Sequence, residues 1–135
     1  MYDIYYAHHR WKFYTRVEEY EIDLIRKHFP NGIIFDPSMD LDTKIVIYRD
    51  LAMRERLKAV DSSDIVVFSS LDGIIDSDVY QEIMRAREKE KQCLYIYYGK
   101  LLPSFKVAKL SDGKRNEQSY ALVMPEVNFN ELRGV

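Results

Sequence analysis

Three carboxylates within eleven residues are the side chains of this chain best suited to chemistry. Asp72 and Asp76 fall in a polar stretch after the apolar run at residues 65–68, and Glu82 comes six residues after Asp76. A helix predicted to start near Ser77 would carry Glu82 about one and a half turns in. An ionised carboxylate in a crevice is a nucleophile toward the anomeric carbon of a sugar, with a second group handling the leaving-group proton. The spacing is therefore compatible with glycosyl transfer.

The same acids also have an ordinary structural interpretation. Asp76 would be a turn residue, and Glu82 would be a solvated side chain on one face of an amphipathic helix. In either case the partial positive charge at the helix N-terminus favours the ionised form of Glu82. The elements that position these side chains decide between the two interpretations.

Short apolar runs alternate with segments of helical periodicity along most of the chain. A capping box of Thr15 and Glu18 predicts the start of the first helix, and Pro-Asn-Gly at residues 30–32 predicts its end. Two runs near the C-terminus have strand character, with a turn signal at 111–113, so they form either a long hairpin or the sides of a flexible loop. The predicted strands are 2–7, 33–35, 65–68, 94–98, 105–110 and 120–124, and the predicted helices are 15–28, 48–60 and 77–91.

Alternating strands and helices predict a single α/β domain over residues 1–135, with a mostly parallel five-stranded sheet in a three-layer sandwich. The flavodoxin-like (Rossmann-like) strand order is the simplest for such units, and its switch point lies between the first and third strands. Ligands bind there, beyond the carboxyl ends of the strands. This crevice would bring Tyr6 and residues 7–10 next to residues 69–72.

Three stretches of the chain resemble the nucleoside 2-deoxyribosyltransferase family, whose relatives include 2′-deoxynucleoside 5′-monophosphate N-glycosidases. They are Y-Y-A at residues 5–7, D-I-V-V-F at residues 64–68, and Asp76 followed by Glu82 and Ala86. In the family, an early strand ends in Y-L-A-G-P, an aspartate leads a hydrophobic run, and D-x-G-T/L-x-x-E-x-G-x-A follows. The resemblance implies a flavodoxin-like fold and a homo-oligomer.

The resemblance also implies roles for individual side chains. The family's nucleophile corresponds to Glu82, and its aspartate for substrate binding and proton handling corresponds to Asp76. A tyrosine of the first strand, here Tyr5 or Tyr6, orients that glutamate. The implied activity is cleavage or transfer at the N-glycosidic bond of a nucleoside or nucleotide, with no metal and no organic cofactor.

The chain departs from the family pattern at several positions. The resemblance covers residues 2–100 in layout, but only residues 64–86 carry specific motif positions. Histidines at residues 8–9 replace the small residues after the first strand, and no glycine occurs in residues 76–80, where one would let a ligand approach the backbone. Arg56 stands where the family often has an aspartate that contacts the base. The pocket for the base must therefore differ.

The predicted crevice also holds polar side chains that could bind a substrate. His8 and His9 have three interpretations: contacts to a phosphate or a ribose hydroxyl, metal ligands, or an ordinary exposed loop. Adjacent histidines without a cysteine or acid at ligand spacing are a weak metal signal. Arg10 would add positive charge for a phosphate. The predicted substrate-binding residues are Tyr6, His8, His9, Arg10, Ser69 and Asp72.

Composition limits the class of partner. The formal net charge is −2 for 135 residues, which gives no support for nucleic-acid or anionic-membrane binding through a bulk basic field. No stretch approaches the ~20 apolar residues of a membrane span. The single Cys93 rules out an internal disulfide and, with no signal-peptide pattern at the N-terminus, predicts a cytoplasmic protein. A small molecule is therefore the expected partner.

Two classes of function follow from these residues. The first is an enzyme acting at an N-glycosidic bond, which would hold a tyrosine, Asp76 and Glu82 within hydrogen-bond reach around an open cavity. The second is a non-catalytic nucleotide- or nucleotide-sugar-sensing domain of the same fold, favoured by the missing glycines and by Arg56. A sensor could bind its ligand with Glu82 in a salt bridge, for example with Arg56 or Arg10. A response-regulator-like domain would need an acidic pair after the first strand, where histidines stand instead.

Overall fold

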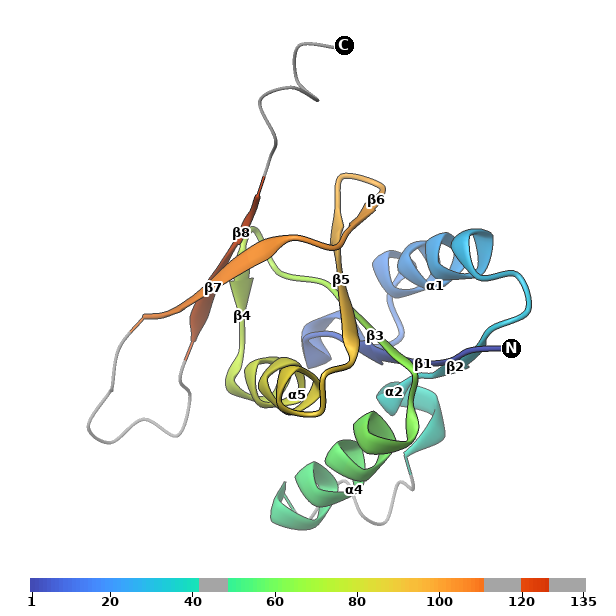
Figure 1. The fold of residues 1–135 in the computed structure, drawn as a ribbon, viewed down its shortest axis with the longest axis horizontal. Helices are drawn as coiled ribbons and strands as arrows, with labels where there is room; N and C mark the ends of the chain where they lie inside the picture. Colours follow the sequence, from blue (N-terminus) through green and yellow to red (C-terminus); the bar gives the residue numbers. More distant parts are fainter. Residues whose placement is uncertain (42–48, 111–119, 127–135) are drawn as a thin grey trace, which may run out of the picture.

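The computed structural model describes residues 1–41, 49–110 and 120–126 (Figure 1). Its strands are β1 (Asp3–Ala7), β2 (Ile33–Phe35), β3 (Ile65–Phe68), β4 (Ile74–Ile75), β5 (Gln92–Tyr97), β6 (Lys100–Leu102), β7 (Phe105–Lys109) and β8 (Ala121–Pro125). Its helices are α1 (Arg16–His28), α2 (Pro37–Asp40), α4 (Arg49–Ser62) and α5 (Ser77–Glu88), and residues Arg10–Lys12 form a 3-10 turn, η1.

Five strands form the main sheet, in the order β2-β1-β3-β5-β6. The first four are parallel, and β6 runs antiparallel to β5. The predicted mostly parallel five-stranded sheet is therefore confirmed. Because β1 pairs with β2 on one side and with β3 on the other, the carboxyl ends of β1 and β3 lie side by side where the strand order reverses.

The fifth strand of this sheet, β6, lies in a segment for which the sequence predicts no strand. It returns along β5 through a two-residue turn at Tyr98 and Gly99, whose φ angles are +46° and +73°. Tight hairpin turns with positive φ at both central residues favour Asn-Gly or Asp-Gly, and tyrosine is rare at the first of these positions. The turn therefore gives little signal in the sequence.

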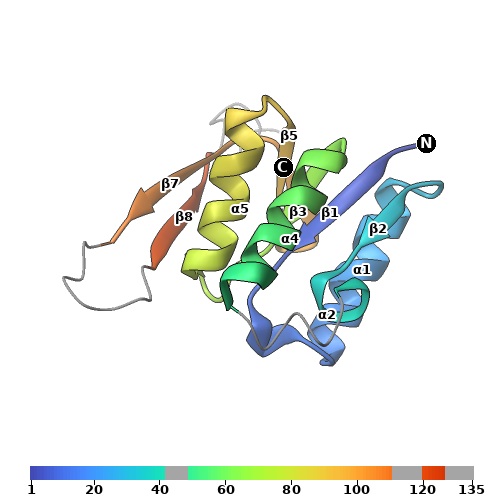
Figure 2. The ribbon, with the colours of Figure 1, turned by 90° about the horizontal axis from the view of Figure 1, so that it is seen from below.

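Helices cover both faces of the main sheet, which is consistent with the predicted three-layer sandwich (Figure 2). Because side chains alternate along a strand, Tyr6 lies in the core beneath α1, and Tyr5 lies in the core beneath α4 and α5. The core beneath α1 also contains Ile4, Ile25, Ile65, Val67, Leu94 and Ile96. The core on the other face contains Val60, Val66, Phe68, Val79, Ile83 and Ala86.

A second, antiparallel sheet has the order β4-β8-β7. β7 and β8 pair from Phe105 opposite Pro125 to Lys109 opposite Ala121, so both C-terminal strand predictions are confirmed. The turn predicted at 111–113 lies outside the described residues. Phe105 and Ala121 join the core beneath α5, which attaches the second sheet to that face.

Some element boundaries differ from the sequence-based prediction. α5 ends at Glu88 and not at residue 91, because the Lys91 amide turns back to donate to the carbonyl of Ala86. Residues 37–40, predicted as loop, form α2, because the Asp36 side chain accepts a hydrogen bond from the first turn. Both differences come from hydrogen bonds at the ends of helices, which the periodicity of apolar residues does not reveal.

The helix α4 extends further at its C-terminal end than predicted. It runs to Ser62, two residues past the expected end at 60, and shortens the turn predicted at 61–64. Residue 48, the predicted first residue of this helix, lies outside the described residues. In the described ranges, no helix combines the length and the apolar character needed to cross a membrane.

Candidate functional site

Tyr5 and Glu82 form the buried centre of the candidate site. Tyr5 lies in the middle of β1, and Glu82 lies on the second turn of α5 above the same face of the sheet. The Tyr5 hydroxyl donates a hydrogen bond to Glu82 Oε1 at 2.8 Å. The exposed fractions of the two residues are 0% and 3%. The fold thus joins two side chains that are 77 positions apart in the chain.

Burial raises the pKa of the Glu82 carboxyl to about 8. The nearby Arg56 and the Tyr5 hydrogen bond lower this pKa, whereas the charges of Asp76 and Asp78 raise it further. Burial also raises the pKa of the Tyr5 hydroxyl well above its usual value, and the Glu82 charge adds to that rise. Desolvation therefore outweighs the helix N-terminal field that was expected to keep Glu82 ionised.

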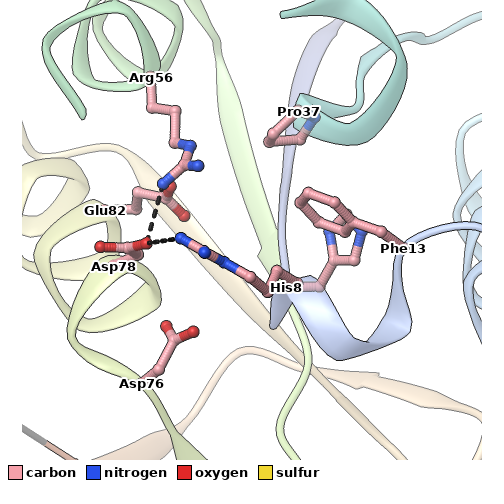
Figure 3. A pocket seen from close by; sticks show the side chains of 8 residues that line it. His8, Phe13, Pro37, Arg56, Asp76, Asp78 and Glu82 are labelled. Carbon is pink, nitrogen blue, oxygen red and sulfur yellow. Dashed lines mark hydrogen bonds and ion pairs between the residues drawn. The ribbon is translucent and has the colours of Figure 1, made fainter. Parts of the chain in front are cut away.

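Arg56 of α4 reaches across to α5 and pairs with Asp78 (Figure 3). Its Nη1 donates to Asp78 Oδ2 at 3.0 Å, and an Nη of Arg10 lies 3.8 Å from the same oxygen. Arg56 Nε is buried and has no hydrogen-bond partner among the described residues. Among the described residues, no cationic side chain lies within 4.0 Å of Glu82. Arg56 and Arg10, the partners expected for Glu82 in a sensor, pair with Asp78 instead.

Asp76 caps the N-terminus of α5 and also faces the site. Its Oδ1 accepts a hydrogen bond from the Val79 amide at 2.8 Å, as expected of the turn residue in the structural interpretation. Its Oδ2 lies 3.4 Å from His9 Nε2. Because His9 Nδ1 accepts from the Trp11 amide, the neutral ring carries its proton on Nε2, toward Asp76. Burial raises the pKa of Asp76.

A small cavity lies between these side chains (Figure 3). Its volume is about 10 Å³, which is room for roughly one water molecule. A pocket for a drug-sized ligand usually has several hundred Å³, so a nucleoside fits only after the wall has moved. Arg10 is the exposed part of that wall. The lining residues are His8, Arg10, Phe13, Pro37, Arg56, Asp76, Asp78 and Glu82.

Two predicted substrate-binding residues lie on the opposite face of the sheet from Glu82. Tyr6 is buried beneath α1, and its hydroxyl donates to Glu21 Oε1. Ser69 Oγ donates to the same oxygen at 2.7 Å and accepts from Lys12 Nζ at 2.9 Å. These contacts form a closed buried network, and they do not place either residue at the cavity beside Glu82.

Asp72 also lies apart from Glu82. It is exposed, has a positive φ of 49°, and sits in the tight turn between Leu71 and Ile74. It lines a separate cavity beside β5 and β8, of about 460 Å³. The fold therefore gathers Tyr5, Asp76 and Glu82 with the loop after β1, but leaves Tyr6, Ser69 and Asp72 elsewhere.

Three residues that line the site were not predicted from the sequence: Phe13, Pro37 and Asp78. Asp78 could have been found, because it precedes Glu82 by four residues and such pairs share one face of a helix. Phe13 and Pro37 come from the segments after β1 and β2, and nothing in their local sequence marks them.

Comparison with models of known protein families found no match for this chain, and comparison with curated proteins found none either.

Proposed function

We propose that the protein binds a nucleoside or nucleotide and cleaves or transfers at its N-glycosidic bond, with Glu82 as the nucleophile. The observation that carries this proposal is the buried hydrogen bond from Tyr5 to Glu82, at the point where the strand order reverses. Tyr5 fixes one carboxylate oxygen and thereby aims the other. A positioned carboxylate of this kind is what covalent glycosyl transfer requires.

In the proposed reaction Glu82 Oε2 attacks the anomeric carbon as the bond to the base breaks. The base leaves with the electron pair of that bond and takes up one proton, and we assign the delivery of this proton to Asp76, whose pKa is raised by burial. Water then cleaves the glycosyl ester in hydrolysis, or a second base displaces the carboxylate in transfer. Only ionised Glu82 attacks, so the rate should rise with pH toward its pKa of about 8.

The presence of Arg56 indicates a base pocket that differs from the family pattern. A guanidinium only donates hydrogen bonds, so it suits a phosphate or an edge of a base that accepts hydrogen bonds. An aspartate at the same place would suit an edge of a base that donates them. The buried Nε of Arg56 has no partner among the described residues and could take up such an acceptor. We therefore expect the substrate to present carbonyl or phosphate oxygens to this side chain.

We also propose that the fold is flavodoxin-like, which the order β2-β1-β3-β5 of the parallel strands supports. We further propose that the protein is a cytoplasmic homo-oligomer. The family resemblance supports the oligomer, and the single buried cysteine, Cys93, fits a reducing compartment. Sedimentation velocity of the purified chain tests the oligomeric state.

A substrate panel tests the activity. Wild type, Glu82→Gln and Glu88→Gln are incubated with nucleosides, deoxynucleosides, their 5′-monophosphates and NAD, and free base is measured by chromatography. Glu88 lies on the same helix but is exposed, so its variant is the matched control. We expect wild type and Glu88→Gln to release base from at least one substrate, and Glu82→Gln to release none. Equal release of base by wild type and both variants would remove Glu82 from the mechanism.

A non-catalytic sensor is the second candidate function. The small cavity of about 10 Å³ and the Arg56–Asp78 ion pair beside it favour this candidate. A sensor would release no base from any member of the panel. One of those compounds would nevertheless raise the melting temperature of both wild type and Glu82→Gln.

A further inference from the structure

Three buried side chains of metal-ligand type converge at the carboxyl ends of β1 and β2. His8 follows β1, Asp36 follows β2, and Glu18 lies on the first turn of α1. One ligand atom from each lies within 4.8 Å of the other two. His8 Nε2 is 2.6 Å from Glu18 Oε2 and 3.7 Å from Asp36 Oδ1. Ligands about 2.0–2.2 Å from one ion lie roughly 3–3.5 Å from each other, so small adjustments would complete a coordination shell.

The imidazole of His8 is oriented like that of a metal ligand. Its Nδ1 lies 3.1 Å from the backbone carbonyl oxygen of Tyr6, which can only accept, so Nδ1 carries a proton. The ring stacks on the Tyr6 ring with the centroids 3.7 Å apart. Nε2 is thereby turned toward the two carboxylates. A second hydrogen bond from the far ring nitrogen to a carbonyl is the usual way that proteins orient a metal-binding histidine.

Both carboxylates are also held in place, and one retains an unpartnered oxygen. Asp36 Oδ1 accepts from the amide and the hydroxyl of Ser38, at 2.9 and 2.8 Å. Glu18 Oε1 accepts from the Tyr14 amide at 3.2 Å. Asp36 is only 4% exposed, and its Oδ2 is buried with no hydrogen-bond partner in the described part of the chain. Leaving a buried carboxylate oxygen without a donor or a cation is costly.

A divalent ion in place of the proton shared by His8 Nε2 and Glu18 Oε2 would also balance the charge of the cluster. A neutral His8 with ionised Glu18 and Asp36 carries −2, which one divalent cation neutralises. A second proton on the imidazole would leave −1 among three buried groups. The buried cation on the same face of the sheet, Lys12, bonds to Glu21 and to Ser69 instead.

We propose that His8 Nε2, Glu18 Oε2 and a carboxylate oxygen of Asp36 bind one divalent transition-metal ion, with Zn²⁺ as the best match. One imidazole and two carboxylates suit zinc, whereas calcium takes six to eight oxygen ligands and magnesium keeps several waters. Three protein ligands leave one position of a tetrahedral ion open. The ion would fasten the ends of β1 and β2 to α1 behind the wall that His8 contributes to the cavity. This inference stands independently of the proposed function.

Metal binding by the whole chain tests this proposal. The protein is stripped with a chelator, titrated with Zn²⁺, Mn²⁺ and Mg²⁺, and assayed by calorimetry and thermal melting. We expect one Zn²⁺ per chain, a higher melting temperature, and weaker binding of Mg²⁺. Asp36→Asn keeps the acceptor that caps α2 but removes the charge, and should raise the Kd for Zn²⁺ at least tenfold. His28→Gln, at an exposed position on α1, is the matched control and should bind as wild type does.

The absorption spectrum of wild type loaded with Co²⁺ gives a second measurement that needs no variant. Binding by His8, Glu18 and Asp36 should give d–d bands without the thiolate charge-transfer band that Cys93 would add. Folded wild type that takes up no metal would overturn the proposal and assign an imidazolium ion pair to the cluster. Equal Zn²⁺ affinity in wild type, Asp36→Asn and His28→Gln would overturn it as well, since the ion would then be adventitious.

Discussion

Two adjacent tyrosines of β1 point to opposite faces of the sheet, and each donates a hydrogen bond to a buried glutamate on a helix. Tyr6 bonds to Glu21 of α1, and Tyr5 bonds to Glu82 of α5. Glu21 also accepts from Lys12 Nζ at 3.0 Å and from Ser69 Oγ at 2.7 Å. On that face the negative charge therefore has a bonded cation and two hydroxyl donors.

The Glu82 face is less complete. Its nearest guanidinium, Arg56, is bonded to Asp78, and a small cavity adjoins the carboxyl. A tyrosine–glutamate pair is thus surrounded by further hydrogen-bond donors on one face and adjoins a small cavity on the other. We therefore expect the number of partners around a buried carboxylate, more than the residue type, to separate structural from chemical roles. The variants below test this difference.

The largest effect is expected from removing the cation on the Glu21 face. Lys12→Met leaves a buried charge with hydroxyl donors only, and should lower the free energy of unfolding by about 3–5 kcal/mol in urea denaturation. Arg26→Met is the control, because it removes an exposed partner of Asp23 at 3.8 Å. That change should stay within about 0.5 kcal/mol. Similar small losses in both variants would show that Lys12 does not sustain a buried charge on Glu21.

A pH dependence specific to the Glu82 face comes next. The folded pKa of about 8 lies above the roughly 4.3 of an unfolded glutamate. Between these values the unfolded chain has released a proton that the folded chain keeps. The contribution of Glu82 to the free energy of unfolding is therefore complete at low pH and is lost as pH rises through this window, by up to about 1.4 kcal/mol per pH unit.

Urea denaturation from pH 5 to pH 9 measures this slope. Glu82→Gln has no proton to lose there, so its unfolding free energy should depend less on pH, and it should be more stable than wild type at the alkaline end. Glu88→Gln, exposed on the same helix, should keep the wild-type slope. Parallel profiles for wild type and Glu82→Gln would contradict a raised pKa.

Substituting each of the two tyrosines in turn should have a smaller effect. Tyr5→Phe and Tyr6→Phe each remove one hydrogen bond to a buried glutamate, at a cost of about 1–3 kcal/mol. Because the Tyr5 hydrogen bond lowers the pKa of Glu82, Tyr5→Phe should raise that pKa further. Tyr6→Phe should leave it unchanged. Carbon-13 NMR titration of the glutamate carboxyls measures both effects, and an equal pKa shift of Glu82 in the two variants would contradict this expectation.

The smallest expected effect comes from Asp78→Asn. This change removes a negative charge that raises the pKa of Glu82 and releases Arg56 from its ion pair, so the pKa of Glu82 should fall. The free energy of unfolding should change by less than about 1 kcal/mol, because Asp78 is partly exposed. The same carboxyl titration measures the shift, and a rise in the pKa would be the opposite of this expectation.

Much of the main sheet could be predicted from the sequence, because buried parallel strands read as apolar runs such as residues 65–68. The capping box also located the start of α1, where Thr15 accepts from the Glu18 amide. β6 could not be found, because its turn places Tyr98 in a conformation that tyrosine rarely adopts. β4 could not be found either, because two residues carry no periodicity.

The site was predictable in part for a similar reason. Neighbouring strands and one helix fix where Tyr5, Asp76 and Glu82 lie, so topology was enough to place them near one another. Predicting the face of the sheet to which a side chain points also requires the exact register of the strand. Tyr6 and Ser69 lie on the other side of the sheet from Tyr5, and register alone decides that side.

The edges of the main sheet have a consequence for assembly. β2 and β6, which end the sheet on its two sides, have only three residues each, whereas the interior strand β5 has six. Short edge strands offer few unpaired backbone groups to a strand of another molecule. The chain is thereby protected against edge-to-edge aggregation of this sheet. An assembly of several copies should accordingly be built through helix surfaces or the second sheet, and its stability should depend on side chains more than on backbone pairing.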